Sequence, residues 1–181
     1  MGMQAVQQPG SQLPPDIRVP VIIDVEASGF HPHSYPIEVG VALESGERFS
    51  RLIKPYPEWT HWSGEAERVH GISRDLLERC GRPGGEVVAE LNRWLAGKTV
   101  YSDGWVLDKP WLIRLFEQAG QKMDFWFSPL EMILSRELMD RWRRAESLVD
   151  RQQPSKRHRA STDALRIQQI YIEAQLLLRQ R

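Results

Sequence analysis

Residues 21–30 read Val-Ile-Ile-Asp-Val-Glu-Ala-Ser-Gly-Phe, an apolar run that is interrupted by two acids. The segment 19–27 is otherwise apolar, which predicts a β-strand near the centre of a sheet. Side chains two positions apart on a strand point to the same face, so Asp24 and Glu26 should lie side by side. Two crowded carboxylates in a poorly solvated place repel each other, and a hard divalent cation with oxygen ligands would neutralise them.

The remaining sequence predicts a mixed sheet with helices on both faces, an α/β fold. Residues 36–44 alternate in polarity, and Ser45-Gly46 predicts a tight turn into a returning strand over 47–54. Two shorter strands are expected at 99–102 and 125–127, each after a helix. Helices are expected at 64–70, 73–79, 86–96, 108–119 (with Pro110 in its first turn), 129–149 and 161–179 (with Ser161 or Thr162 as its cap), with a basic loop over 151–160. A hairpin followed by helix-connected strands favours this architecture.

Length and composition are those of one globular domain. The chain has 181 residues, and we interpret 1–18 as a flexible polar tail and 19–181 as the domain. Lysine plus arginine and aspartate plus glutamate are equal at 24 each, so net charge alone does not indicate a nucleic-acid partner. The single cysteine, Cys80, excludes an internal disulfide and a multi-cysteine metal site. No apolar run is long enough to span a bilayer and no secretion signal is present, so we expect a cytoplasmic protein.

Three further residues could join the acid pair: Asp108, His158 and Asp163. Each has an ordinary alternative when taken alone, since Asp108 could cap a helix, Asp163 could face a helix dipole and His158 could be a solvated loop residue. Asp103, at the end of the strand 99–102, is the rival of Asp108. Together they can converge at one sheet edge, where two metal ions would bind both oxygens of a phosphoryl transfer and the histidine would deprotonate water.

This arrangement resembles the DEDDh 3′–5′ exonucleases over about residues 20–175. The order is Asp24-Val-Glu26, a distant aspartate, then His158-Arg-Ala-Ser-Thr-Asp163, with a His-Gly-Ile segment beginning at His70. The resemblance implies a ribonuclease H-like mixed five-stranded sheet. It also implies that Asp24, Glu26, Asp108 and Asp163 hold two Mg²⁺ or Mn²⁺ ions, and that His158 is the general base rather than a metal ligand.

The chain departs from the family pattern at two places. The threonine that usually follows the glutamate is Ala27 here, which removes one hydroxyl near the substrate. The middle motif, often His-Asn-x-x-Phe-Asp, reads Asp-Gly-Trp-Val-Leu-Asp over residues 103–108, so Asp103 could be an auxiliary acid. Substrate preference therefore does not carry over from any one member of the family.

By the resemblance, the chain hydrolyses single-stranded DNA or RNA from a 3′ end to nucleoside monophosphates, and forms a homodimer. Phe30, Ala27, Ser28 and His70 would contact the substrate, and Phe30 would stack on a terminal base unless it is simply a packed aromatic. Other residues could stack on bases or attract phosphates, although packing and solvation are their ordinary uses: Trp59, Trp62, Trp105, Arg141, Arg143, Arg144, Lys156, Arg157 and Arg159. The alternatives are a non-catalytic nucleic-acid-binding module on the same fold and an accessory subunit that needs a protein partner.

Overall fold

The computed structural model describes residues 13–152 and 158–180. Most of the expected N-terminal tail lies outside these residues, as does half of the expected 151–160 loop, including Lys156 and Arg157. Within the described ranges, no helix is both long enough and apolar enough to cross a membrane.

The sheet is mixed, has five strands and follows the order β3-β2-β1-β4-β5. Its central strand β1 pairs antiparallel with β2 and parallel with β4. Strands β2 and β3 form the expected hairpin, and β5 pairs parallel with β4 at the other edge. The strands are β1 (Val21–Ala27), β2 (Pro36–Ala42), β3 (Arg48–Leu52), β4 (Thr99–Ser102) and β5 (Trp126–Pro129). Because β1 and β4 are parallel, their C-terminal ends meet at one edge of the sheet.

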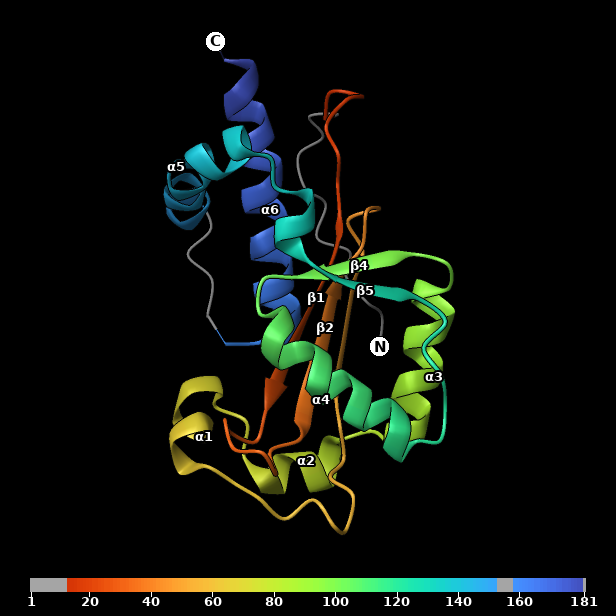
Figure 1. Ribbon diagram of the computed structural model, residues 1–181. Coiled ribbons are helices and arrows are strands. Elements are labelled where there is room, and N and C mark those ends of the chain that lie inside the picture. Colours follow the sequence, from red (N-terminus) through yellow and green to blue (C-terminus); the bar gives the residue numbers. More distant parts are fainter. Residues whose placement is uncertain (1–12, 153–157, 181) are drawn as a thin grey trace, which may run out of the picture.

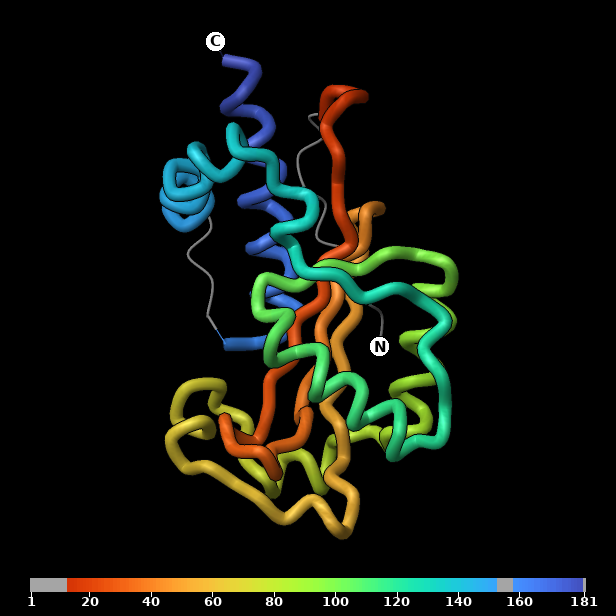
Figure 2. The backbone as a smooth tube through the Cα atoms, in the orientation of Figure 1, coloured from red at the N-terminus to blue at the C-terminus, as the bar shows by residue number. Residues whose placement is uncertain are grey.

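Helices cover both faces of the sheet, as the sequence predicted (Figure 1). Alternate residues of β1 supply the two cores, with Ile23 and Val25 packing on one side and Ile22 on the other. The first core is completed by α2 (Arg74–Cys80), α3 (Gly84–Leu95) and α4 (Trp105–Gln118), and the second by α5 (Arg136–Gln152) and α6 (Ala160–Arg179). A short helix α1 (Gly64–His70) lies beside the β1–β2 connection (Figure 2). There the amide of Ser63 donates to the carbonyl of Ser28.

The single helix expected over 129–149 is wrong. A 3₁₀ turn, η1 (Leu130–Ile133), comes first, and α5 begins only at Arg136. Ser135 separates the two, because its hydroxyl accepts the amide of Leu138 at 3.3 Å and so caps the new helix. The helix also extends past 149 to Gln152, into the stretch that was expected to be a loop.

Two other helix starts differ from expectation. Helix α4 begins at Trp105, three residues before the expected start, so Pro110 falls beyond the first turn instead of within it. At α6, the cap expected from Ser161 or Thr162 is wrong, because the cap position is Arg159. The carboxylate of Asp163 instead accepts the amide of Arg159 from inside the first turn. A side chain of the first turn thereby reaches back and satisfies the amide of the cap residue itself.

Helix α6 starts directly on strand β2 at Gly40. A Cβ built on this glycine would lie 2.0 Å from the amide nitrogen of Ser161 and 2.2 Å from the carbonyl carbon of Ala160. Since backbone atoms cannot move aside as a flexible side chain can, only a glycine permits this approach. The close contact places the first turn of α6 over the strand that neighbours β1.

Candidate active site

The acid pair of β1 lies on one face of the strand, as its spacing predicted. Asp24 and Glu26 are half-buried and alternate with the buried Ile23 and Val25. Burial raises the pKa of Asp24 well above its usual range, and the negative charge of Asp108 and then of Glu26 raises it further. Burial, followed by the charge of Asp163, raises the pKa of Glu26 to about 7. These shifts show carboxyls that are poorly solvated and crowded by like charge.

Asp108 enters the same cluster from the first turn of α4. Its side chain is only 4% exposed, and its Oδ2 accepts the hydroxyl of Ser102 at 2.5 Å. Burial raises the pKa of the Asp108 carboxyl to about 7, while the Ser102 hydrogen bond acts in the opposite direction. The rival Asp103 is an exposed residue at the end of β4, although desolvation still raises the pKa of its carboxyl. Both acids therefore lie near the C-terminal end of β4, and they differ in burial.

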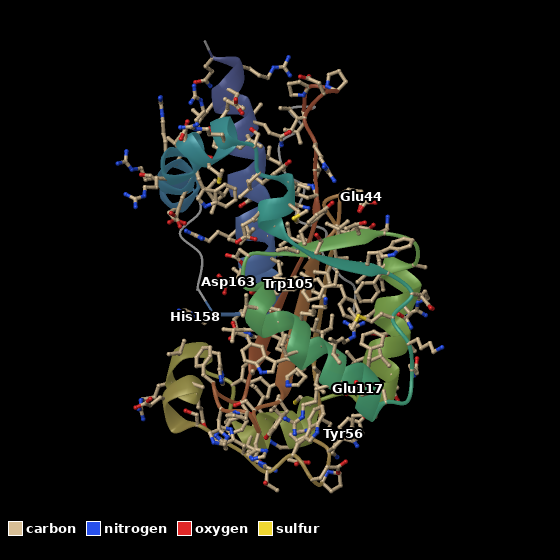
Figure 3. All side chains as sticks on the ribbon, in the orientation of Figure 1. Glu44, Tyr56, Trp105, Glu117, His158 and Asp163 are labelled. Carbon is tan, nitrogen blue, oxygen red and sulfur yellow. The ribbon has the colours of Figure 1, made fainter. Side chains whose placement is uncertain are left out.

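His158 and Asp163 join the cluster from the start of α6 (Figure 3). His158 has a left-handed backbone with φ +64°, which a residue with a side chain rarely adopts. Its amide donates to Oδ2 of Asp163 at 2.6 Å, and this bond holds the unusual turn. One ligand atom from each of Glu26, His158 and Asp163 lies within 4.8 Å of the other two. The structure therefore brings residues from opposite ends of the described chain to one point.

The donor set fits a divalent cation. Carboxylate oxygens suit Mg²⁺ or Mn²⁺. An imidazole among the ligands also suits softer metals. Burial, and then the negative charge of neighbouring acids, raises the pKa values of Glu26 and Asp108, and the positive charge of a bound cation would oppose both effects. The sequence predicted His158 as a base and not as a ligand, and a ring nitrogen of His158 lies within 4.8 Å of a carboxylate oxygen of both Glu26 and Asp163.

Glu38 and Arg159 belong to the site, and the sequence analysis assigned no role to Glu38. Glu38 is paired across the sheet with Glu26, is 1% exposed, and binds the guanidinium of Arg159 at 2.8 Å. The positive charge of Arg159 lowers the pKa of Glu26 and so opposes the effect of burial. The sequence could have indicated a role for Glu38, because it is the one charged residue in the strand Pro36–Ala42.

The predicted substrate contacts fall into two groups. Phe30 is 81% exposed, and its ring centroid lies 6.1 Å from that of Trp111. Ala27, Ser28 and His70 are buried instead. The hydroxyl of Ser28 accepts the amide of Tyr35 at 3.1 Å, and this bond helps to close the β1–β2 connection.

His70 ends helix α1, and its Nδ1 accepts the amide of Ile72 at 3.0 Å. Gly71, with φ +69°, supplies the left-handed residue that lets the chain turn there. The His-Gly-Ile segment thus has a structural role in this chain. A substrate contact by His70 stays a prediction.

The other aromatic and basic candidates range from buried to exposed. Trp59 is buried, and Trp62 donates to Glu67 at 2.6 Å. The half-buried Trp105 begins α4, next to the acids, and carries the ammonium of Lys109 at 4.6 Å from its ring centroid. Arg141 is half-buried on α5, and Arg143 and Arg144 are exposed there.

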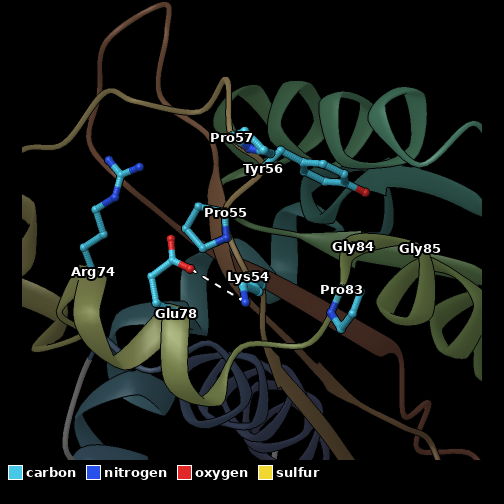
Figure 4. A pocket seen from close by; sticks show the side chains of 9 residues that line it. All are labelled: Lys54, Pro55, Tyr56, Pro57, Arg74, Glu78, Pro83, Gly84 and Gly85. Carbon is cyan, nitrogen blue, oxygen red and sulfur yellow. Dashed lines mark ion pairs between the residues drawn. The ribbon is translucent and has the colours of Figure 1, made fainter.

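A separate pocket of about 370 Å³ lies near the start of α3, and none of the clustered acids lines it (Figure 4). Its charged groups already have partners within the protein. Lys54 pairs with Glu78 at 3.8 Å, and Arg74 donates to the carbonyls of Trp59 and Thr60. The chemistry of the molecule is therefore concentrated at the acid cluster and not in this pocket.

Solved structures of exonuclease I share the fold of this chain. An Escherichia coli exonuclease I–single-stranded DNA complex in a zinc-bound form superposes with a TM-score of 0.69 at 16% identity, covering 86% of this chain and 40% of that one. A complex of the E. coli enzyme with a dA16 oligonucleotide gives 0.61 at 14% identity, with coverages of 86% and 39%. Exonuclease I from Methylocaldum szegediense gives 0.54 at 17% identity, with coverages of 66% and 30%.

This likeness establishes the fold, which is the ribonuclease H-like α/β architecture that the sequence predicted. The chain spans less than half the length of each of these three structures. No protein-family model matches the sequence, and no curated protein resembles it at a significant level.

Proposed function

We propose that this chain is a metal-dependent 3′–5′ exonuclease that hydrolyses single-stranded DNA or RNA to nucleoside monophosphates. The convergence of Glu26, His158 and Asp163 within 4.8 Å is the observation that carries the proposal. Asp24 and Asp108 add two acids whose charges act on the same cluster. The fold shared with exonuclease I structures, among them complexes with single-stranded DNA, agrees with this chemistry.

Asp24, Glu26, Asp108 and Asp163 would hold two divalent ions, Mg²⁺ or Mn²⁺. Bound there, such ions supply positive charge to the phosphate and to the leaving oxygen and lower the pKa of water. The chain's own contribution is geometric, because β1, α4 and α6 fix the carboxylates before substrate arrives. The short bond from Ser102 holds the carboxylate of Asp108 in one orientation.

His158 would take a proton from the attacking water. Its side chain is exposed, so its ring can reach both solvent and a bound phosphate. A base must be neutral to accept a proton. The hydrogen bond from its amide to Asp163 fixes the backbone from which the ring extends.

Phe30 would stack on the terminal base. The ring is exposed and lies against Trp111 on α4, the helix that also supplies Asp108. Stacking on an aromatic side chain contributes about 1–3 kcal/mol per base and requires an unpaired base. This arrangement favours single-stranded 3′ ends over blunt duplexes.

The test is incubation of purified protein with 5′-labelled single-stranded DNA and RNA in Mg²⁺, in Mn²⁺ and in EDTA. A ladder that shortens from the 3′ end, with release of nucleoside monophosphates, is expected only with metal. Asp163→Asn should abolish it, whereas Asp140→Asn, which changes an exposed acid of α5, should not. Full activity in EDTA contradicts the proposal. Tight binding without turnover in any metal points instead to a nucleic-acid-binding module.

A further inference from the structure

A buried carboxylate on β2 is tied to the start of α6. Glu38 is 1% exposed, and removing a carboxylate from water is costly unless partners compensate. Its Oε1 and Oε2 accept the Arg159 guanidinium at 2.8 and 3.0 Å, and Oε2 also accepts the amide of Ala160 at 3.1 Å. A fourth donor, the hydroxyl of Ser50 on β3, reaches Oε1 at 3.1 Å. Three of these four contacts therefore bind Glu38 to the first residues of one helix.

The anchored residues lie between two residues of the candidate site. His158 immediately precedes Arg159, and Asp163 follows Ala160 within the first turn. The same turn is closed by amide bonds to the Asp163 carboxylate from His158 at 2.6 Å and from Arg159 at 3.1 Å. Because these residues form one rigid turn, fixing Arg159 and Ala160 also fixes His158 and Asp163.

The other end of the anchor is the partner of Glu26 in the sheet. Glu38 and Glu26 occupy paired positions on neighbouring strands. An ion pair between Glu38 and Arg159 thus sets the distance between the α6 turn and the β1 acids. The same ion pair also engages the guanidinium of Arg159, whose positive charge acts on Glu26. Without Glu38, this guanidinium would compete with a metal ion for the Glu26 carboxylate.

We propose that Glu38 is a positioning residue, which aligns Asp163 and His158 with Glu26 through Arg159 and the Ala160 amide. The inference rests on the proposed function and adds to it a residue outside the acid and histidine set. A purely structural role would lower stability alone. A positioning role also lowers turnover and metal affinity, while substrate binding changes little.

The test compares Glu38→Gln with the matched control Ser50→Ala, which removes a hydrogen bond from β3 to the same carboxylate and keeps the contacts of Glu38 with Arg159 and Ala160. The measurements are kcat and KM on 5′-labelled single-stranded DNA, Mn²⁺ affinity of the free protein by electron paramagnetic resonance, and Tm. Loss of an outer partner of a metal site typically costs about 10- to 100-fold in activity or affinity. We expect that loss in kcat and in Mn²⁺ affinity for Glu38→Gln, a nearly unchanged KM, and kcat close to wild type for Ser50→Ala.

Two further variants keep the inference falsifiable. Arg159→Lys keeps the charge but loses the two-pronged contact, so it should lower kcat and Mn²⁺ affinity even if Glu38→Gln fails to fold. The double variant Glu38→Gln/Arg159→Lys should be no worse than the worse of its two single variants, because the two residues act as one unit. Wild-type kcat and Mn²⁺ affinity in folded Glu38→Gln, or equal losses in Ser50→Ala, would overturn the positioning role. A wild type without turnover would refute the proposed function instead, and the Mn²⁺ comparison would still decide the role of Glu38.

Discussion

The acid cluster should make the protein less stable as pH rises when no metal is present. Glu26 has its pKa raised from 4.5 to about 7 in the folded protein, so the folded state keeps a proton that the unfolded chain has already lost. Stability is therefore highest at or below pH 4.5 as far as Glu26 is concerned, and falls as pH rises toward 7. A rise of this size corresponds to about 3 kcal/mol. Asp108, raised to about 7 by burial, acts with the same sign.

The assay is thermal unfolding in EDTA between about pH 5.5 and pH 8, repeated with Mg²⁺. For a domain of this length, 1 kcal/mol corresponds to roughly 2–4 °C. About 2 kcal/mol of the Glu26 contribution is lost within this pH range, so Tm should fall on the order of 4–8 °C from Glu26 alone. Mg²⁺ should recover most of that loss at the higher pH, because a cation at about 100 times its Kd adds about 2.7 kcal/mol.

Glu26→Gln should flatten the pH dependence, since the amide does not titrate. Glu44→Gln is the matched control. A hydrogen bond from Lys98 lowers the pKa of Glu44, so the ionised Glu44 carboxylate stabilises the folded protein, opposite to the effect of Glu26. A wild-type Tm in EDTA that does not fall across this range, or a Glu26→Gln variant with the wild-type slope, would refute the reasoning.

Three other outcomes follow from the structure. Gly40→Ala should destabilise the protein by about 3 kcal/mol or more in urea unfolding, because its Cβ meets backbone at 2.0 Å. Gly85→Ala, with nothing within 4 Å of its Cβ and a helical position, should be neutral or stabilising by about 0.5–1 kcal/mol. Asp108→Ala should abolish cleavage while Asp103→Ala reduces it modestly, and the reverse result would make Asp103 the essential acid. Phe30→Ala should raise KM for single strands more than it lowers kcat. Equal rates on blunt duplexes and single strands would contradict a stacking role for Phe30.

The sheet could be predicted because its pattern is local. The apolar run of β1, the alternation of β2 and the Ser45-Gly46 turn each specify a strand or a hairpin without reference to distant residues. Helix starts were harder, because they depended on tertiary contacts. Asp163 satisfies the amides that open α6, and this could not be read from the presence of Ser161 and Thr162.

The clustering of the acids with His158 could be predicted from the sequence, but the contacts that hold the cluster together could not. Asp24 and Glu26 are recognisable as acids on an apolar strand, and their shared face follows from strand geometry. The anchor from Glu38 to Arg159 joins residues that are far apart in sequence, so no local pattern indicates it. Nor does the sequence indicate that Ser28 and His70 would be buried, because their burial follows from how the β1–β2 connection and α1 pack together.

The placement of Asp163 on α6, the last described helix, has a consequence for synthesis. A nascent chain emerges with β1 and its acid pair first, and domains generally begin to fold while translation continues. Asp163 and His158 can reach Glu26 only once α6 has formed and settled on Gly40. Under the proposed function, a nascent chain whose translation has not yet passed α6 has no assembled nuclease site, so it cannot attack the messenger from which it is being translated.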